Sequence, residues 1–121
     1  RIIAGILSTD MKHHGDHVRL LQNFKLVQDI EPDQSQFLVE LLMHSADIGN
    51  PFMPPDISAR WGDRIAKEFG MQVAQERELG LPVTSFMAGL DEALAAAKSR
   101  IGFIDFVVQP LADPMLSIFP G

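Results

Sequence analysis

The sequence predicts an all-α fold, a helical bundle, on three observations. Apolar residues recur every three or four positions over most of the 121 residues, which is the period of an amphipathic helix. The eight prolines stand apart from these periodic stretches, as expected of a residue that ends or kinks helices. No stretch shows the sustained alternation of apolar and polar residues that is typical of a half-buried strand.

Two periodic stretches open the chain. The first predicts the end of a buried helix, and the second continues the same period after Gly15. The polar residues around Gly15, between the two stretches, indicate a turn. The apolar positions are Ile2, Ile3, Ile6 and Leu7 in the first stretch and Val18, Leu21, Phe24 and Val27 in the second.

Residues 33–48 form the clearest helix. Asp33 follows Pro32 and is a candidate N-cap, and Gly49 stands where a glycine commonly ends a helix. A proline-rich loop at 51–55 follows. One face of the predicted helix carries Phe37, Leu38, Leu41, Leu42 and Ser45.

Two longer helices are predicted in the second half. Residues 56–79 repeat an apolar side chain every four positions, and Gly80 and Pro82 end the pattern. Residues 90–108 are alanine-rich and then apolar, with Pro110 marking a kink or an end, while the valines and phenylalanines at 103–108 leave a strand as an alternative there. The repeated side chains of the first of these helices are Ile57, Trp61, Ile65, Phe69 and Val73.

Composition excludes several classes of function. With 10 basic and 16 acidic residues the net charge is −6, which argues against a surface for nucleic acid. The chain has no cysteine, so disulfides and thiol nucleophiles are excluded and an intracellular, cytoplasmic location is favoured. The longest uninterrupted apolar stretch, at 2–7, is far shorter than the roughly 20 residues of a membrane span. We therefore expect neither a nucleic-acid partner nor a membrane span.

Polar groups appear abruptly at the end of the predicted helix 33–48. His44 and Asp47 share a face, and a carboxylate on an otherwise apolar face favours pairing or a cation. Asp47 is thus a candidate ligand for a hard divalent metal. The alternative is that Asp47 and Asn50 cap the helix end and the following turn.

Other polar and aromatic residues allow two interpretations each. The histidines around Gly15 suggest metal ligands, but they match no tight ligand spacing on one helix face, and a glycine among polar residues favours a turn. Trp61, Ile65 and Phe69 on one predicted helix, with Phe103 on the last, could clamp a flat ring or belong to the core. Arg100, at the start of an apolar run, is either a side chain at the edge of the core or a donor aimed into a pocket.

Several motifs together resemble the class I cyclic nucleotide phosphodiesterases, in order and spacing, over almost the whole chain. The resemblance implies that residues 1–121 are the C-terminal part of an all-α catalytic domain of the HD-type metal-hydrolase superfamily. The motifs are Thr9-Asp10-Met11 with His14, the block at 44–51, Trp61-Gly62-Asp63-Arg64-Ile65 with Glu68-Phe69, Gly80-Leu81-Pro82, and the block at 101–106 leading to Pro110-Leu111.

The resemblance implies a two-metal hydrolase. In this family two divalent ions, zinc and magnesium or manganese, bridge a hydroxide that attacks the cyclic phosphate while a histidine protonates the leaving 3′-oxygen. Of the two histidines and two aspartates that bind these ions, only the last aspartate matches here, at Asp47. The other ligands and the general-acid histidine are expected upstream of Arg1, so this chain carries no catalytic residue of its own.

The resemblance also assigns a nucleotide pocket. Asn50 stands beside the base, Ile65 and Phe103 clamp its two faces, and Trp61 packs behind the site. Whether Phe86 or Met87 lines the pocket is open, because this chain is about two residues longer than common members between positions 86 and 101. The pocket residues carried over are Met11, Asn50, Ile65, Phe69, Arg100 and Phe103.

Arg100 stands where the family has a glutamine that hydrogen-bonds the purine edge. A glutamine amide both donates and accepts, whereas arginine has five donors and no acceptor. We therefore expect Arg100 to favour guanine, whose O6 and N7 both accept, or to prevent purine binding. The alternative is that Arg100 turns out to solvent.

The expected function is metal-dependent hydrolysis of 3′,5′-cyclic AMP, cyclic GMP or both to 5′-monophosphates, carried out by the complete domain and not by these residues alone. The cyclic nucleotide and the upstream part of the domain are the expected partners. The alternative is a non-catalytic nucleotide-binding or helix-packing module derived from this family. A plain helical bundle with accidental motif matches is a third reading, which the number of agreeing motifs disfavours.

Overall fold

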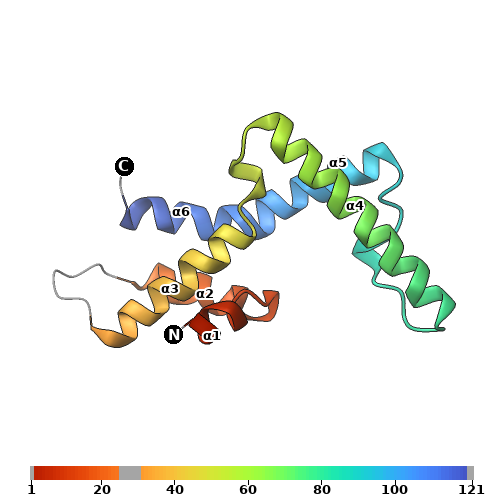
Figure 1. Cartoon of the computed structure of the whole chain (residues 1–121). Coiled ribbons are helices and arrows are strands. Elements are labelled where there is room, and N and C mark those ends of the chain that lie inside the picture. Colours follow the sequence, from red (N-terminus) through yellow and green to blue (C-terminus); the bar gives the residue numbers. More distant parts are fainter. Residues whose placement is uncertain (1, 25–30, 120–121) are drawn as a thin grey trace. The chain divides into compact units, whose positions relative to one another are not determined.

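The computed structural model describes residues 2–24 and 31–119, and every regular element in them is helical (Figure 1). The predicted all-α class is confirmed, since neither described range contains a strand. Val27, which was predicted to continue the second helical stretch, lies outside the described residues. The α-helices are α1 (Ile2–Leu7), α2 (His14–Gln22), α3 (Pro32–Asp47), α4 (Pro55–Glu78), α5 (Ala93–Phe103) and α6 (Gln109–Ile118). Between them lie single 3₁₀ turns, η1 (Met11–His13), η2 (Asn50–Phe52) and η3 (Ser85–Met87), and a π-helical turn, η4 (Ile104–Val108).

The helices form two compact units. The first comprises residues 1–49 with 105–121, and the second comprises residues 50–104. In the first unit α1 packs on α3 and α2 packs on α6. The buried apolar side chains of this unit are Leu21, Leu41, Ile48, Val108 and Leu111.

Helix α1 forms as predicted, but the expectation that its isoleucines are buried is wrong for this chain. Ile2 and Ile3 are 76% and 74% exposed. The contact with α3 runs instead through Gly5, where an added Cβ would lie 2.6 Å from Sδ of Met43. The apolar side of α1 therefore has no covering partner in the part of the chain that the structure describes.

The predicted turn at Gly15 is also wrong. Asp10 caps the 3₁₀ turn by accepting from the Lys12 backbone N–H at 3.0 Å, and α2 follows without a break, with Gly15 as its second residue. The cap lies upstream of the glycine, so His14 and His17 become residues of α2 and His13 becomes the last residue of η1, rather than loop residues.

Helix α3 matches the prediction in extent but not in its cap. The N-cap is Glu31, whose side chain forms a capping box with Gln34, and Asp33 lies in the first turn. Pro32 takes the first helical position, where its missing N–H costs nothing, and this places the cap one residue before it. At the other end the Gly49 backbone N–H donates to Ala46 O at 3.3 Å.

Helix α4 ends as predicted at a left-handed glycine. Gly80 has φ of +65°, a conformation that glycine adopts without steric cost, and Pro82 follows. The Glu76 carboxylate accepts from the Thr84 backbone N–H and hydroxyl, both at 2.8 Å, and so ties the next loop to the helix. Of the predicted apolar face, Val73 is buried and Trp61 is 47% exposed.

The chain stays helical where a strand was the alternative and does not end at Pro110. The π-helical turn at Ile104–Val108 comes directly before α6, and Pro110 lies in the first turn of α6. A proline has no backbone N–H to donate to the carbonyl four residues earlier, and its ring clashes with that carbonyl. The wider π turn before α6 accommodates both effects.

Ala93–Ile118 is one helical stretch of 26 residues, with an 18-residue window of mean hydropathy 1.3 that is 11% buried. By length and composition alone it could cross a membrane, a property that helices packed inside soluble proteins share. The longest uninterrupted apolar run does not reveal this helical stretch, because polar side chains divide its sequence at Asp105, Gln109 and Asp113. The absence of a membrane span stays a prediction.

Candidate functional site

The residues assigned to the site divide between the two units. Met11 and Asp47 belong to the first, whereas Asn50, Ile65, Phe69, Arg100 and Phe103 belong to the second. Each unit is therefore described by itself.

Asp47 is the last residue of α3 and is exposed, one helical turn beyond the fully buried His44. Its carboxylate has no ion-pair partner among the residues that the structure describes. Within residues 2–24 and 31–119 no three His, Asp or Glu side chains come together in a way that could hold a metal ion. Asp47 can thus offer one ligand, but these residues do not make a metal centre.

Three imidazoles meet where side chains of α2 contact a side chain of α3. His14 Nδ1 lies 3.0 Å from His44 Nε2, and the His17 ring centroid lies 5.0 Å from that of His44. Burial is the main cause that lowers the pKa of each of the three histidines below its usual 6.5. The cluster is not apparent from the sequence, although His14 and His17, three residues apart, would share a face of a helix.

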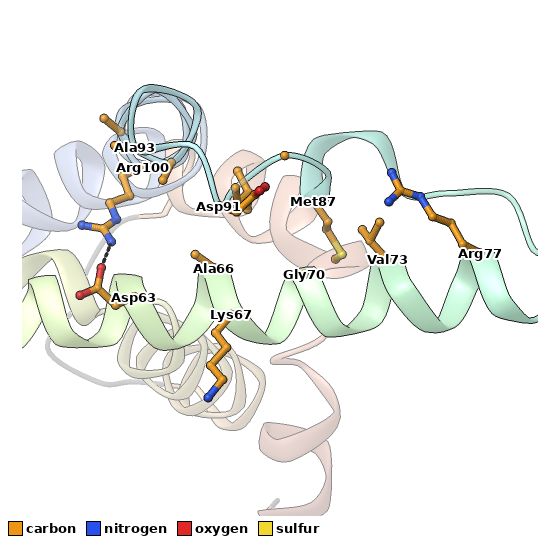
Figure 2. Close-up of a pocket in the computed structure, with 14 residues that line it drawn as sticks. Asp63, Ala66, Lys67, Gly70, Val73, Arg77, Met87, Asp91, Ala93 and Arg100 are labelled. Carbon is orange, nitrogen blue, oxygen red and sulfur yellow. Dashed lines mark hydrogen bonds and ion pairs between the residues drawn. The ribbon is translucent and has the colours of Figure 1, made fainter.

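The second unit contains a cavity of about 760 Å³ between α4, the loop after it and α5 (Figure 2). Arg100 lines it, and Met87 does so rather than Phe86. Helix α4 turns one face to the cavity at three- and four-residue spacing, and Ile65 and Phe69 lie off that face. The lining residues are Asp63, Ala66, Lys67, Gly70, Val73, Arg77, Met87, Gly89, Leu90, Asp91, Ala93, Ala96, Ala97 and Arg100.

The remaining predicted pocket residues lie outside this cavity. Asn50 begins η2, and Phe69 makes an edge-to-face contact with Phe86 at a centroid separation of 6.1 Å. Ile65 and Phe103 are half-buried. Met11 is 46% exposed.

Arg100 is bound to a neighbouring helix. Its Nη2 donates to Asp63 Oδ1 at 2.5 Å, the contact drawn as a dashed line in Figure 2. The guanidinium also lies against Gly62, where an added Cβ would be 2.6 Å from both Cζ and Nε of Arg100. Arg100 is therefore partly exposed and is also held by Asp63, a polar partner that is not apparent from the sequence.

Comparison with known proteins decides the family. The model of the family described as 3′5′-cyclic nucleotide phosphodiesterase matches residues 1–121. The chain belongs to this family. The resemblance found in the sequence is confirmed, and with it the family's all-α architecture.

Relatives within the phosphodiesterase family include a probable 3′,5′-cyclic phosphodiesterase (pde-3) of Caenorhabditis elegans, 35% identical over 99% of this chain and 18% of the relative. A dual specificity calcium/calmodulin-dependent 3′,5′-cyclic nucleotide phosphodiesterase, 1B, of Mus musculus is 34% identical over 90% of this chain and 20% of the relative. Among solved structures, the phosphodiesterase domain of Salpingoeca rosetta rhodopsin phosphodiesterase matches with a TM-score of 0.93 and 36% identity, over 98% of this chain and 37% of that one. The chain thus spans about a fifth of these curated phosphodiesterases.

Proposed function

We propose that this chain supplies the C-terminal part of a catalytic domain that hydrolyses 3′,5′-cyclic AMP, cyclic GMP or both to 5′-monophosphates. The observation that carries the proposal is the match of the phosphodiesterase family over residues 1–121, together with a fold that superimposes on a solved phosphodiesterase domain at a TM-score of 0.93. The curated relatives described above are named as 3′,5′-cyclic phosphodiesterases.

In the complete domain we propose two divalent metal ions, zinc and magnesium or manganese, with Asp47 as one ligand. The exposed carboxylate at the end of α3 supports this role, because it is not engaged by a cation of the described chain. Bound metals would supply an activated hydroxide and offset phosphoryl charge. The remaining ligands have no match here, so the isolated chain should be inactive.

For the nucleotide we propose a pocket in the second unit made by Asn50, Ile65, Phe69, Arg100 and Phe103. The half-buried state of Ile65, Phe69 and Phe103 supports this, since side chains not consumed by the core remain available to a planar ring. Met11, in the first unit, stays a prediction from the family resemblance.

The absence of cysteine supports a cytoplasmic location.

A non-catalytic nucleotide-binding or helix-packing module is the second candidate. It is favoured by Arg100, which stands at the position of the family's glutamine and forms an ion pair with Asp63.

The deciding experiment is an assay of the complete domain with both cyclic nucleotides in the presence of magnesium and zinc or manganese. Hydrolysis of either nucleotide supports the catalytic proposal, and no turnover of either supports the non-catalytic module. The isolated 121 residues, assayed in parallel, should show none. Robust metal-dependent hydrolysis by them would contradict the partial site proposed here.

A further inference from the structure

Arg100 and Asp63 form one polar unit within the second unit of the structure. They come from different helices, α5 and α4, and stand 37 residues apart in sequence. Gly62 provides the space: a side chain at this position would occupy the place of the guanidinium. The Trp61-Gly62-Asp63 stretch thus both admits the arginine and anchors it.

The pair offers a donor and an acceptor side by side. An arginine has five N–H donors and no acceptor, and the structure records one donation, from Nη2 to Asp63 Oδ1. An ionised carboxylate has two oxygens and about four acceptor positions, so most of the acceptor capacity of Asp63 stays free in this contact. Both side chains remain partly exposed, 42% for Arg100 and 76% for Asp63, at one end of the cavity (Figure 2).

We propose that Asp63 and Arg100 read the purine edge together, with Asp63 supplying the acceptor that arginine lacks. This rests on the proposed function, which puts Arg100 beside the base. Adenine presents its N6 amino group as a donor and N7 as an acceptor, whereas guanine presents N7 and O6 as acceptors. Arg100 alone can donate to both guanine acceptors, whereas with adenine it can donate only to N7 and leaves the amino group unpaired. With Asp63 beside it, the carboxylate accepts from the adenine amino group while the guanidinium donates to N7.

Asp63 is therefore a specificity-determining residue that keeps the site open to adenine. The pair divides between two side chains the donor and acceptor functions that a glutamine amide carries on one. The complete domain should accordingly hydrolyse both cyclic nucleotides.

The test replaces Asp63 in the complete domain and compares kcat/KM for cyclic GMP and cyclic AMP. In D63A we expect the cyclic GMP to cyclic AMP ratio to rise about tenfold through loss of cyclic AMP turnover, since one base-edge contact discriminates by that order. An exposed ion pair contributes little to stability, so the variant should fold.

Two controls separate base reading from a general effect of the substitution. Asp56→Ala removes another exposed ion pair of α4, with Arg60 at 3.5 Å, and should leave the ratio unchanged. In an R100Q background the amide supplies its own acceptor, so adding D63A should no longer shift the ratio.

The outcomes distinguish this inference from the proposed function. An active domain in which D63A leaves the ratio unchanged, or shifts it equally in the R100Q background, overturns the role of Asp63 and leaves the hydrolase assignment standing. An unmodified domain that hydrolyses cyclic GMP but not cyclic AMP also overturns the role of Asp63 and leaves the hydrolase assignment standing. Failure to hydrolyse either nucleotide overturns both proposals.

Discussion

His14 and His44 meet through their ring nitrogens, 3.0 Å apart, although 30 residues separate them in sequence. One nitrogen must donate and the other accept, so at least one of the two rings is neutral. His44 is fully buried. The ring of His17 lies beside it, at a centroid distance of 5.0 Å, and His17 is 4% exposed. The contact between α2 and α3 is therefore built on imidazoles that favour the uncharged state.

This cluster predicts that acidification destabilises the fold. Burial lowers the pKa of His14, His17 and His44, so below about pH 6.5 the unfolded chain takes up protons that the folded chain resists. The stabilisation is complete above pH 6.5 and is lost as the pH falls toward the lowered pKa values. Glu40, Asp16 and Asp47 oppose this shift, and His13 adds to it.

Urea unfolding at about pH 7.5 and pH 5 measures the effect. The free energy of unfolding should be smaller at the lower pH. A His44→Gln variant should show a weaker pH dependence, whereas His13→Gln should retain most of it. Equal pH dependence in the two variants would contradict the assignment to the buried cluster.

Leu41 and Leu42 form a matched pair on α3 for testing the core. Leu41 is 0% exposed and Leu42 is 54% exposed. Leu41→Ala should lower the free energy of unfolding by about 2–5 kcal/mol, because it removes buried methyl groups and leaves a cavity. Leu42→Ala should change it by about 0.5 kcal/mol or less. Similar losses in both variants, measured by denaturant unfolding, would mean that α3 packs through a different face.

The sequence predicted α3 and α4 nearly to their ends because each combines a clear helical period with local stop signals, such as Gly80 followed by Pro82. The same period could not say which positions of α3 are buried. Leu41 and Leu42 both fit the predicted face, and only the packing against other helices separates them. The prediction of burial for Ile2 and Ile3 failed for the same reason.

The polar contacts were less predictable than the helices. His14 with His44, and Arg100 with Asp63, join residues 30 and 37 positions apart, and no local pattern brings them together. Recognition of the family assigned Arg100 to the nucleotide site but could not supply its partner, because the family has a glutamine at that position. Asp47 was found because it stands out on an otherwise apolar face, a signal contained in α3 alone.

Two helix-associated glycines should respond in opposite directions to alanine. A Cβ at Gly15 meets nothing within 4 Å, so Gly15→Ala should stabilise the protein by roughly 0.5–1 kcal/mol through helix propensity. A Cβ at Gly49 would lie 2.9 Å from Ser45 O and 3.2 Å from Ala46 O, so Gly49→Ala should destabilise by about 1–3 kcal/mol. Thermal unfolding of both variants measures this. Stabilisation by both would show that the end of α3 is looser than its geometry indicates.

Asp47 can be tested through metal affinity in the complete domain. Asp47→Ala should weaken binding of zinc or manganese measured by titration calorimetry, because it removes one charged ligand from the proposed centre. Asp33→Ala, which removes an exposed carboxylate from the first turn of the same helix, should bind metal like the unmodified domain. Equal affinity in the two variants would count against Asp47 as a ligand.

The isolated chain should display an unusual amount of apolar surface. Phe106 is 80% exposed and Leu116 is 69% exposed, and both lie in the stretch Ala93–Ile118. Large exposed apolar patches on soluble proteins mark surfaces that other elements cover, and this chain spans 37% of the solved phosphodiesterase domain that it resembles.

We therefore expect the 121 residues alone to bind a hydrophobic dye and to self-associate in size-exclusion chromatography, whereas the complete domain should do so far less. Phe106→Ser should reduce dye binding by the isolated chain with little change in its stability. Leu111→Ala, at a position that is 2% exposed, should lower stability and increase dye binding instead. A monomeric isolated chain with no dye binding would show that these side chains are covered within the chain itself.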